Sequence, residues 1–145
     1  MKFQKFIVFT LFAFLLLNMQ CDEDDVVLQS YCNSNIVVDN TTYQNIDSAF
    51  FSFINIEVDG DCLVVEISSS GCDGNTWVME LIDSEDVLES LPVQRNLKLA
   101  LTNEEACLAV FSKTQTFDLT PIRVEGANEV ILNIEDFPEP ITYLY

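Results

Sequence analysis

The chain has 145 residues, 49% of them hydrophobic, with 24 acidic residues, 6 basic residues and no histidine. This length and apolar content suffice for one domain with its own core. The net charge of −18 disfavours nucleic acids and anionic lipid surfaces as partners, because both are bound through Lys and Arg. The absence of histidine excludes Ser-His-Asp and Cys-His catalysis.

The first twenty residues have the pattern of an export signal. Lys2 and Lys5 precede an apolar run from Phe6 to Leu17, and these are the charged and hydrophobic regions of a secretory signal. As a helix, this run spans about 18 Å against roughly 30 Å of hydrocarbon, so a permanent transmembrane helix is the weaker interpretation. We predict that residues 1–20 are a signal peptide, helical in form, that is removed on export.

A single cysteine, Cys21, separates the apolar run from four acids at positions 22–25. This arrangement resembles a bacterial lipoprotein precursor. The resemblance implies that Cys21 receives the lipid and anchors the protein to a membrane of the bacterial cell envelope; the alternative is an incidental thiol in a secreted protein. The acidic run also resembles the surface-export signal of some Gram-negative outer membrane lipoproteins. The alternative is a simple inner-leaflet avoidance signal or a spacer. We expect residues 21–30 to be an acidic tether.

Residues 31–145 show alternating apolar and polar positions, bounded by turn residues, and little helical periodicity. This pattern predicts one all-β domain, a two-sheet antiparallel β-sandwich of about seven or eight strands and of immunoglobulin-like size.

The clearest hairpin reads FINIEVDGDCLVVEI, residues 53–67. Asp59-Gly60 between two alternating runs predicts a type I′ turn. We expect the inward faces of the two strands to carry Ile54, Ile56 and Val58, and Leu63, Val65 and Ile67.

Further strands follow in chain order. The inward positions that we predict are Trp77, Met79 and Leu81 in one strand, and Arg95, Leu97, Leu99 and Leu101 in the next. Residues 107–119 form one bent strand or two, and the runs 129–135 and 141–145 complete the set. The segment 84–94 is expected to make one helical turn before Pro92 or to cross between the sheets.

Four further cysteines lie on the exported side, and an even number in an oxidising location predicts two disulfides. Four cysteines permit three connectivities. We favour Cys72–Cys107 and Cys32–Cys62, because Cys72 follows one strand at a tight turn and Cys107 opens another. Gly71-Cys72, PVQ at 92–94, Cys107 and FDLTP at 117–121 together resemble a group of small, uncharacterised, secreted bacterial β domains. The resemblance implies a β-rich fold and the Cys72–Cys107 bond, and it transfers no activity.

Two acidic turns are candidate calcium ligands, since Ca²⁺ accepts mixed carboxylate, amide and carbonyl oxygens. The candidate ligands are Asp59, Asp61, Asp73 and Asn75. The alternative for each Asp-Gly is an ordinary hairpin turn, and no other cofactor is predicted.

The function predicted for the domain is a non-catalytic binding or structural module at the outer membrane, with a protein or glycan ligand of unknown identity. The alternatives are a carboxylate-dependent enzyme acting on glycans and a calcium-binding surface module. Phe50 and Phe51 are adjacent, so a strand through them places one ring on each face and leaves one exposed or covered by a neighbouring segment.

Overall fold

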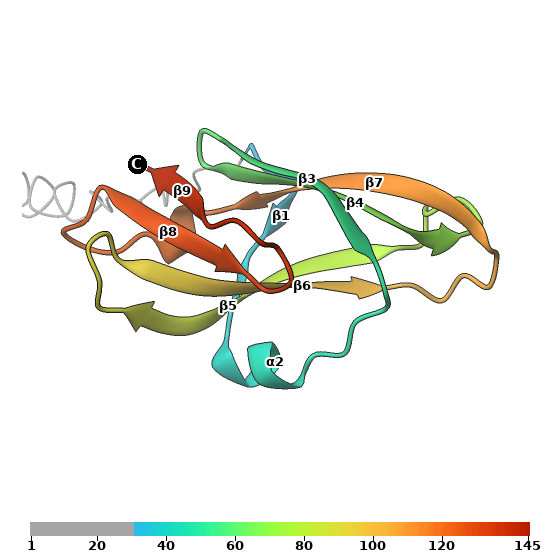
Figure 1. The fold of residues 1–145 in the computed structure, drawn as a ribbon, viewed down its shortest axis with the longest axis horizontal. Helices are drawn as coiled ribbons and strands as arrows, with labels where there is room; N and C mark the ends of the chain where they lie inside the picture. Colours follow the sequence, from blue (N-terminus) through green and yellow to red (C-terminus); the bar gives the residue numbers. More distant parts are fainter. Residues whose placement is uncertain (1–30) are drawn as a thin grey trace, which may run out of the picture.

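In the computed structural model, residues 31–145 are described, and they fold into two β-sheets (Figure 1). The predicted signal peptide (1–20), Cys21 and the rest of the predicted tether (21–30) lie outside the described residues. The four-stranded sheet has the order β1 (Ser34–Asn35), β7 (Ala109–Asp118), β4 (Cys62–Gly71) and β3 (Ser52–Asp59). The five-stranded sheet has the order β2 (Val37–Val38), β5 (Val78–Leu88), β6 (Gln94–Thr102), β8 (Glu129–Ile134) and β9 (Ile141–Leu144).

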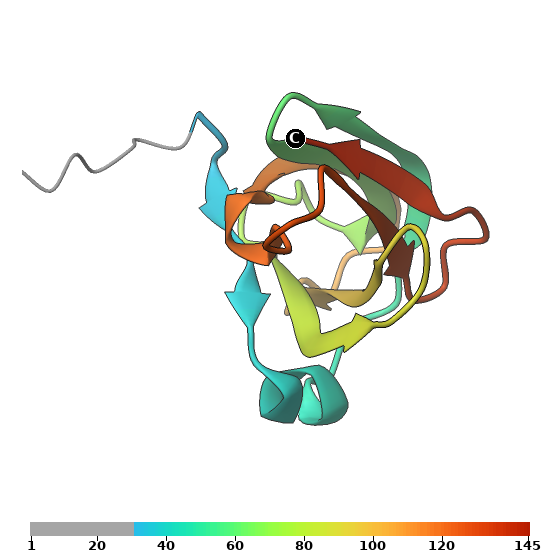
Figure 2. The ribbon, with the colours of Figure 1, turned by 90° about the vertical axis from the view of Figure 1, so that its left-hand side faces the viewer.

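The predicted two-sheet β-sandwich is confirmed, but the sheets are mixed and not purely antiparallel. Three strand pairs are parallel, namely β1–β7, β2–β5 and β6–β8. The chain crosses between sheets at buried Ile36, so β1 and β2 belong to different sheets. After β6, the chain passes through β7 in the opposite sheet before β8 returns beside β6, which makes that pair parallel. Figure 2 shows the two sheets facing each other.

The core lies between the sheets, where the alternation of the sequence predicted it. The predicted inward residues that are buried are Leu63, Val65, Ile67, Trp77, Met79, Leu81, Leu97, Leu99 and Leu101. Phe117, Leu132 and Tyr143 from the later strands join them. All members of this cluster belong to residues 36–145, so this part of the chain has a core of its own.

The β3–β4 hairpin differs from the prediction in two details. A bulge between Phe53 and Asn55 shifts the alternation, so that Phe53 packs inward and Ile54 is 53% exposed. Asp59 pairs with Cys62, so the turn residues are Gly60 and Asp61. Only Gly60 has a positive φ, of 58°, and this fits a type II′ turn with glycine first and not the predicted type I′.

The segment 84–94 is neither helical nor a crossing between sheets. β5 continues to Leu88 and turns back into β6 in the same sheet. The ladder is irregular between Asp83 and Val87, with Glu85 at φ 63°. The Asp83 carboxylate accepts hydrogen bonds from Arg95 Nε at 2.8 Å and Nη2 at 2.6 Å, and this buried contact holds the two strands together across the irregularity.

The two disulfides have the favoured pairing and sit at opposite ends of β4. Cys32–Cys62 has a Cα–Cα distance of 5.6 Å, and Cys72–Cys107 one of 4.8 Å. A strand of this length spans roughly 30 Å. The described chain therefore begins beside the β3–β4 turn, far from the loops that the second disulfide joins.

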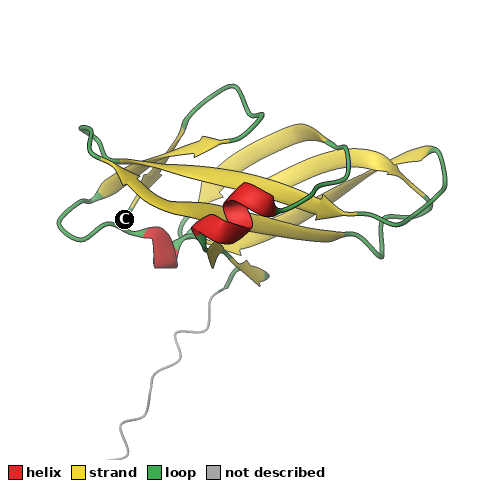
Figure 3. Ribbon diagram, turned by 90° about the horizontal axis from the view of Figure 1, so that it is seen from below, coloured by secondary structure: helices red, strands yellow, loops and turns green. Residues whose placement is uncertain are grey.

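Two short helices complete the described part. Helix α2 (Asn40–Asn45) is capped by Asp39 and contacts β5 outside the sandwich (Figure 3). The 3-10 helix η2 (Thr120–Ile122) follows β7 at Pro121. Within residues 31–145, no helix is long and apolar enough to cross a bilayer.

Candidate functional site

A groove of about 680 Å³ opens on one side of the sandwich. Its walls come from three separate parts of the chain: the segment 46–53, which leads from α2 into the start of β3, residues 98–99 of β6, and the loop 135–138 between β8 and β9. Figure 1 shows the segment from α2 to β3 and the loop after β8 on either side of the end of β6. Binding sites for small ligands are typically clefts of roughly 300–1,000 Å³.

Phenylalanine rings form the apolar lining of the groove. Phe51 and Phe53 meet edge to face with ring centroids 5.1 Å apart, and Phe53 meets Phe137 at 5.5 Å. These three rings are partly buried against the core, whereas Phe50 is 86% exposed. The bulge in β3 turns Phe53 towards this lining, and so the local irregularity builds the site.

The charged groups of the groove lie on β6 and on the loop after β8. Lys98 Nζ lies 3.2 Å from Glu135, donates a hydrogen bond to the Tyr43 carbonyl at 3.0 Å, and lies 4.8 Å from the centre of the Tyr43 ring. Burial, followed by the negative charge of Glu135, raises the pKa of Tyr43. The lysine is thus occupied within the fold, and Asp136, which is exposed with φ 63°, forms no ion pair within residues 31–145.

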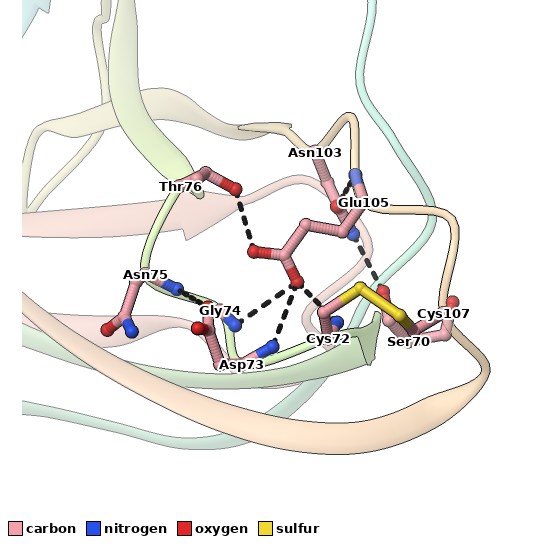
Figure 4. The surroundings of a disulfide bond; sticks show 9 residues. All are labelled: Ser70, Cys72, Asp73, Gly74, Asn75, Thr76, Asn103, Glu105 and Cys107. Carbon is pink, nitrogen blue, oxygen red and sulfur yellow. Dashed lines mark hydrogen bonds between the residues drawn. A yellow bond between two sulfur atoms is a disulfide. The ribbon is translucent and has the colours of Figure 1, made fainter.

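A second polar cluster closes the loop after β4 (Figure 4). The Glu105 carboxylate accepts a hydrogen bond from the Thr76 hydroxyl at 2.7 Å, and others from the backbone N–H groups of Cys72, Asp73 and Gly74 at 2.5, 3.2 and 3.2 Å. The Thr76 contact and these N–H groups lower the pKa of Glu105 to about 2. The cluster is an anion site that the chain fills with its own side chain.

A third cluster ties the β3–β4 turn to the C-terminal strand. The Asp61 carboxylate pairs with Arg123 and accepts a hydrogen bond from the Tyr143 hydroxyl at 2.7 Å. Burial and this hydrogen bond raise the pKa of Tyr143 to about 12, and the contacts with Tyr143 and Arg123 lower the pKa of Asp61. Arg123 also lies 5.1 Å from the ring of Tyr145. Arg123 therefore links β9 and Tyr145 to the β3–β4 turn.

The structure does not bring the four calcium candidates together. Asp59 and Asp61 lie before β4, and Asp73 and Asn75 lie after it, roughly 30 Å away. Asp61 is occupied by Arg123 and Tyr143, and the Asp73 side chain accepts a hydrogen bond from the Asn75 N–H at 2.9 Å. No cluster of three or more potential metal-binding side chains occurs within residues 31–145.

One residue of the groove, Phe50, was visible in the sequence as a candidate exposed ring, and the rest of the groove was not. Phe50 is exposed and Phe51 is partly buried, so one ring of the pair is left exposed as predicted; the strand predicted through them is wrong, because β3 begins only at Ser52. The two other walls of the groove, at Lys98 and at the loop 135–138, carry no sequence signal that connects them with Phe50. Trp77 is core, as expected.

Comparisons with known proteins give a likeness of fold. No protein-family model and no curated protein matches the sequence. A solved structure of a protein of unknown function DUF1344 from Bacteroides vulgatus ATCC 8482 is similar, with a TM-score of 0.50 and 15% identity over 77% of this chain. A putative toxin-related protein from Parabacteroides distasonis ATCC 8503 gives a TM-score of 0.49 and 13% identity over 76% of this chain. The matches span 55% and 61% of those two chains, respectively.

The fold and the comparison with the first of these structures define the class of this protein as an all-β, two-sheet domain, here with two disulfides.

Proposed function

We propose that this protein is a non-catalytic binding module of the bacterial cell envelope, anchored by lipid at Cys21, and that the phenylalanine-lined groove is its ligand site. The observation that carries the binding role is the exposure of Phe50 beside an open groove already lined by three partly buried rings. In the free protein, the Phe50 ring is in contact with water. A ligand that covers the ring removes this apolar surface from water, and the hydrophobic free energy of that burial favours binding.

The carboxylates of the groove favour binding over glycan hydrolysis. Its two acids, Glu135 and Asp136, are neighbours on one loop. A glycosidase places its two carboxyl groups on opposite sides of the bond that it cleaves.

The binding role is tested with the uncharged dye N-phenylnaphthylamine, whose fluorescence rises in apolar sites. The protein used is the chain from residue 21 onward, with Cys21→Ser to prevent lipidation. We expect saturable binding that Phe50→Ala weakens by about tenfold or more, because the exposed ring supplies apolar contact worth ~1.5–3 kcal/mol. Leu108→Ala is the matched control, since Leu108 is 91% exposed and lies outside the groove. If Phe50→Ala binds the dye as tightly as the unsubstituted protein does, the groove is not the binding site.

The anchor is tested separately by growing cells with radioactive palmitate. The proposal predicts label in the full chain and none in Cys21→Ala. Protease treatment of intact cells then distinguishes a surface-exposed domain, which is digested, from one facing the periplasm. Labelling that survives the substitution contradicts the lipid anchor at Cys21.

A further inference from the structure

The groove is also a gap beside β6 in the five-stranded sheet. β8 pairs with β6 only from Gln94 to Leu97, and beyond this point the neighbour of β6 is the segment that leads into β3. There, Ala49 N–H donates to the Leu101 carbonyl at 2.8 Å, and the Ser48 hydroxyl accepts from Leu101 N–H at 3.0 Å. These attachment points on β6 are four residues apart, or roughly 13 Å along a strand.

The backbone of Leu99 faces this gap. On the β8 side of β6, the carbonyls of Val93, Leu97 and Leu101 accept hydrogen bonds from Ile131, Glu135 and Ala49 in turn. Backbone groups two residues apart in a strand point to the same edge, so Leu99 directs its N–H and C=O to this side. Leu99 also lines the groove. The groove therefore has one backbone donor and one backbone acceptor, both from Leu99, in a lining that also contains phenylalanine rings.

The charge around the gap selects among ligands. Residues 31–145 carry 20 acidic and 4 basic side chains, a net charge of −16. Lys98 is already paired with Glu135, which leaves Asp136 as the groove acid without an ion pair in the described part of the chain. A ligand with positive charges beside an apolar centre is attracted, and an anionic ligand is repelled.

From these observations we infer that the groove binds an extended peptide segment of a partner protein, with an apolar or aromatic side chain flanked by Lys or Arg. This inference depends on the proposed binding role of the groove and names its ligand. The peptide backbone pairs with Leu99 as an added strand, its apolar side chain packs among Phe50, Phe53 and Phe137, and its flanking charges face Asp136. Main-chain pairing with side-chain pockets is an established mode of peptide recognition.

The inference is tested by displacement of N-phenylnaphthylamine with the peptide acetyl-Lys-Val-Phe-Val-Lys-amide. Two sets of N-methylated peptides are compared with it: one methylated at the Phe amide and one at the Val amides. In a paired strand, alternate amides face the neighbouring strand. We expect one set to bind about tenfold more weakly, through loss of a backbone hydrogen bond, and the other to bind as the parent peptide does.

The charge requirement has its own comparison. Replacing both lysines of the peptide by glutamates is expected to abolish displacement at low salt. Asp136→Asn is expected to weaken binding of the lysine peptide, whereas Glu104→Gln, which removes an exposed acid outside the groove, is expected to leave it unchanged. Asparagine tolerates the positive φ at this position, so the loop is retained.

The outcomes separate the two proposals. If the dye binds but all peptides displace it equally, or none displaces it, the peptide inference is wrong and the binding groove stands. If the dye fails to bind the unsubstituted groove, the proposed function itself is wrong.

Discussion

At the scale of single residues, Glu105 shows how one side chain can organise a loop. It receives three backbone N–H groups and one hydroxyl, and its neighbour in space, Cys72, is fixed to Cys107 by the disulfide. Gly71 is needed beside it, because a Cβ there would come within 2.9 Å of the Trp77 ring. The loop is therefore fixed by a carboxylate, a disulfide and a close approach of backbone to an aromatic ring.

The depressed pKa of Glu105 predicts a particular acid sensitivity. Its folded-state pKa of about 2 lies below the ordinary value of 4.5, so the ionised carboxylate contributes stability above about pH 4.5, and this contribution is lost as the pH falls towards 2. We expect Glu105→Gln to melt at a lower temperature than the parent protein at pH 7, with the difference vanishing near pH 2. Thermal unfolding followed by circular dichroism between these pH values measures the effect.

Glu104→Gln is the control for this experiment, since it removes the same charge at the adjacent, exposed position. A difference between Glu105→Gln and the parent that stays constant from pH 7 to pH 2 would mean that the ionised carboxylate is not what stabilises the loop.

At the scale of elements, the strands are joined by side chains as well as by ladders. The Asp83–Arg95 pair links β5 to β6 where their ladder is irregular. Between the two sheets, Lys113 and Gln115 of β7 donate to the backbone carbonyls of Trp77 at 2.5 Å and Met79 at 3.1 Å, at the start of β5. Each contact satisfies polar groups that a break in regular pairing would leave exposed or unpartnered.

The buried Asp83–Arg95 pair predicts strong coupling between its members. Arg95→Met leaves the fully buried Asp83 carboxylate without its cation, and breaking a buried ion pair in this way costs about 3–5 kcal/mol. Asp83→Leu is expected to cost a similar amount. The double variant is expected to lose much less than the sum of the two, because no unpaired charge remains. Urea unfolding of all four proteins measures the cycle, and additive losses would contradict the coupling.

At the scale of the whole molecule, two disulfides stabilise a small domain whose acidic side chains repel one another. Residues 31–145 carry a net charge of −16, which disfavours the compact state by self-repulsion. The two disulfides fasten the two ends of β4, and their cysteines have sequence separations of 30 and 35. The groove lies on the same domain, at residues 46–53, 98–99 and 135–138.

Removal of a disulfide is expected to expose this balance. On the chain-entropy model, a loop of 35 residues contributes about 4 kcal/mol. We expect Cys72→Ala/Cys107→Ala to lower the free energy of unfolding by about this amount, and added sodium chloride to restore part of it by screening the acidic surface. Urea unfolding at low and high salt measures both effects. If added salt leaves the free energy of unfolding of Cys72→Ala/Cys107→Ala unchanged or lowers it further, repulsion among the acidic side chains is not the force that opposes folding.

The choice among the three possible cysteine pairings was decided by the tertiary structure. The sequence by itself determined the class of fold and the inward faces of most strands. These follow from local patterns, because alternation decides which side chains face a core and turn residues decide where strands end. Ile54 was placed wrongly, since a bulge moves one residue out of a pattern that is otherwise regular.

Only the tertiary structure decided where the groove forms. The groove depends on Phe50, Leu99 and Phe137 coming together from segments far apart in the chain, and on the β6–β8 pairing ending at Leu97, so that no strand pairs with this edge of β6 at Leu99. A local sequence pattern does not predict which distant segments become neighbours, because this depends on the order of the strands in the sheets and on where the pairing of each strand ends. Phe50 was visible in the sequence as an exposed ring, and the fold supplied its surroundings.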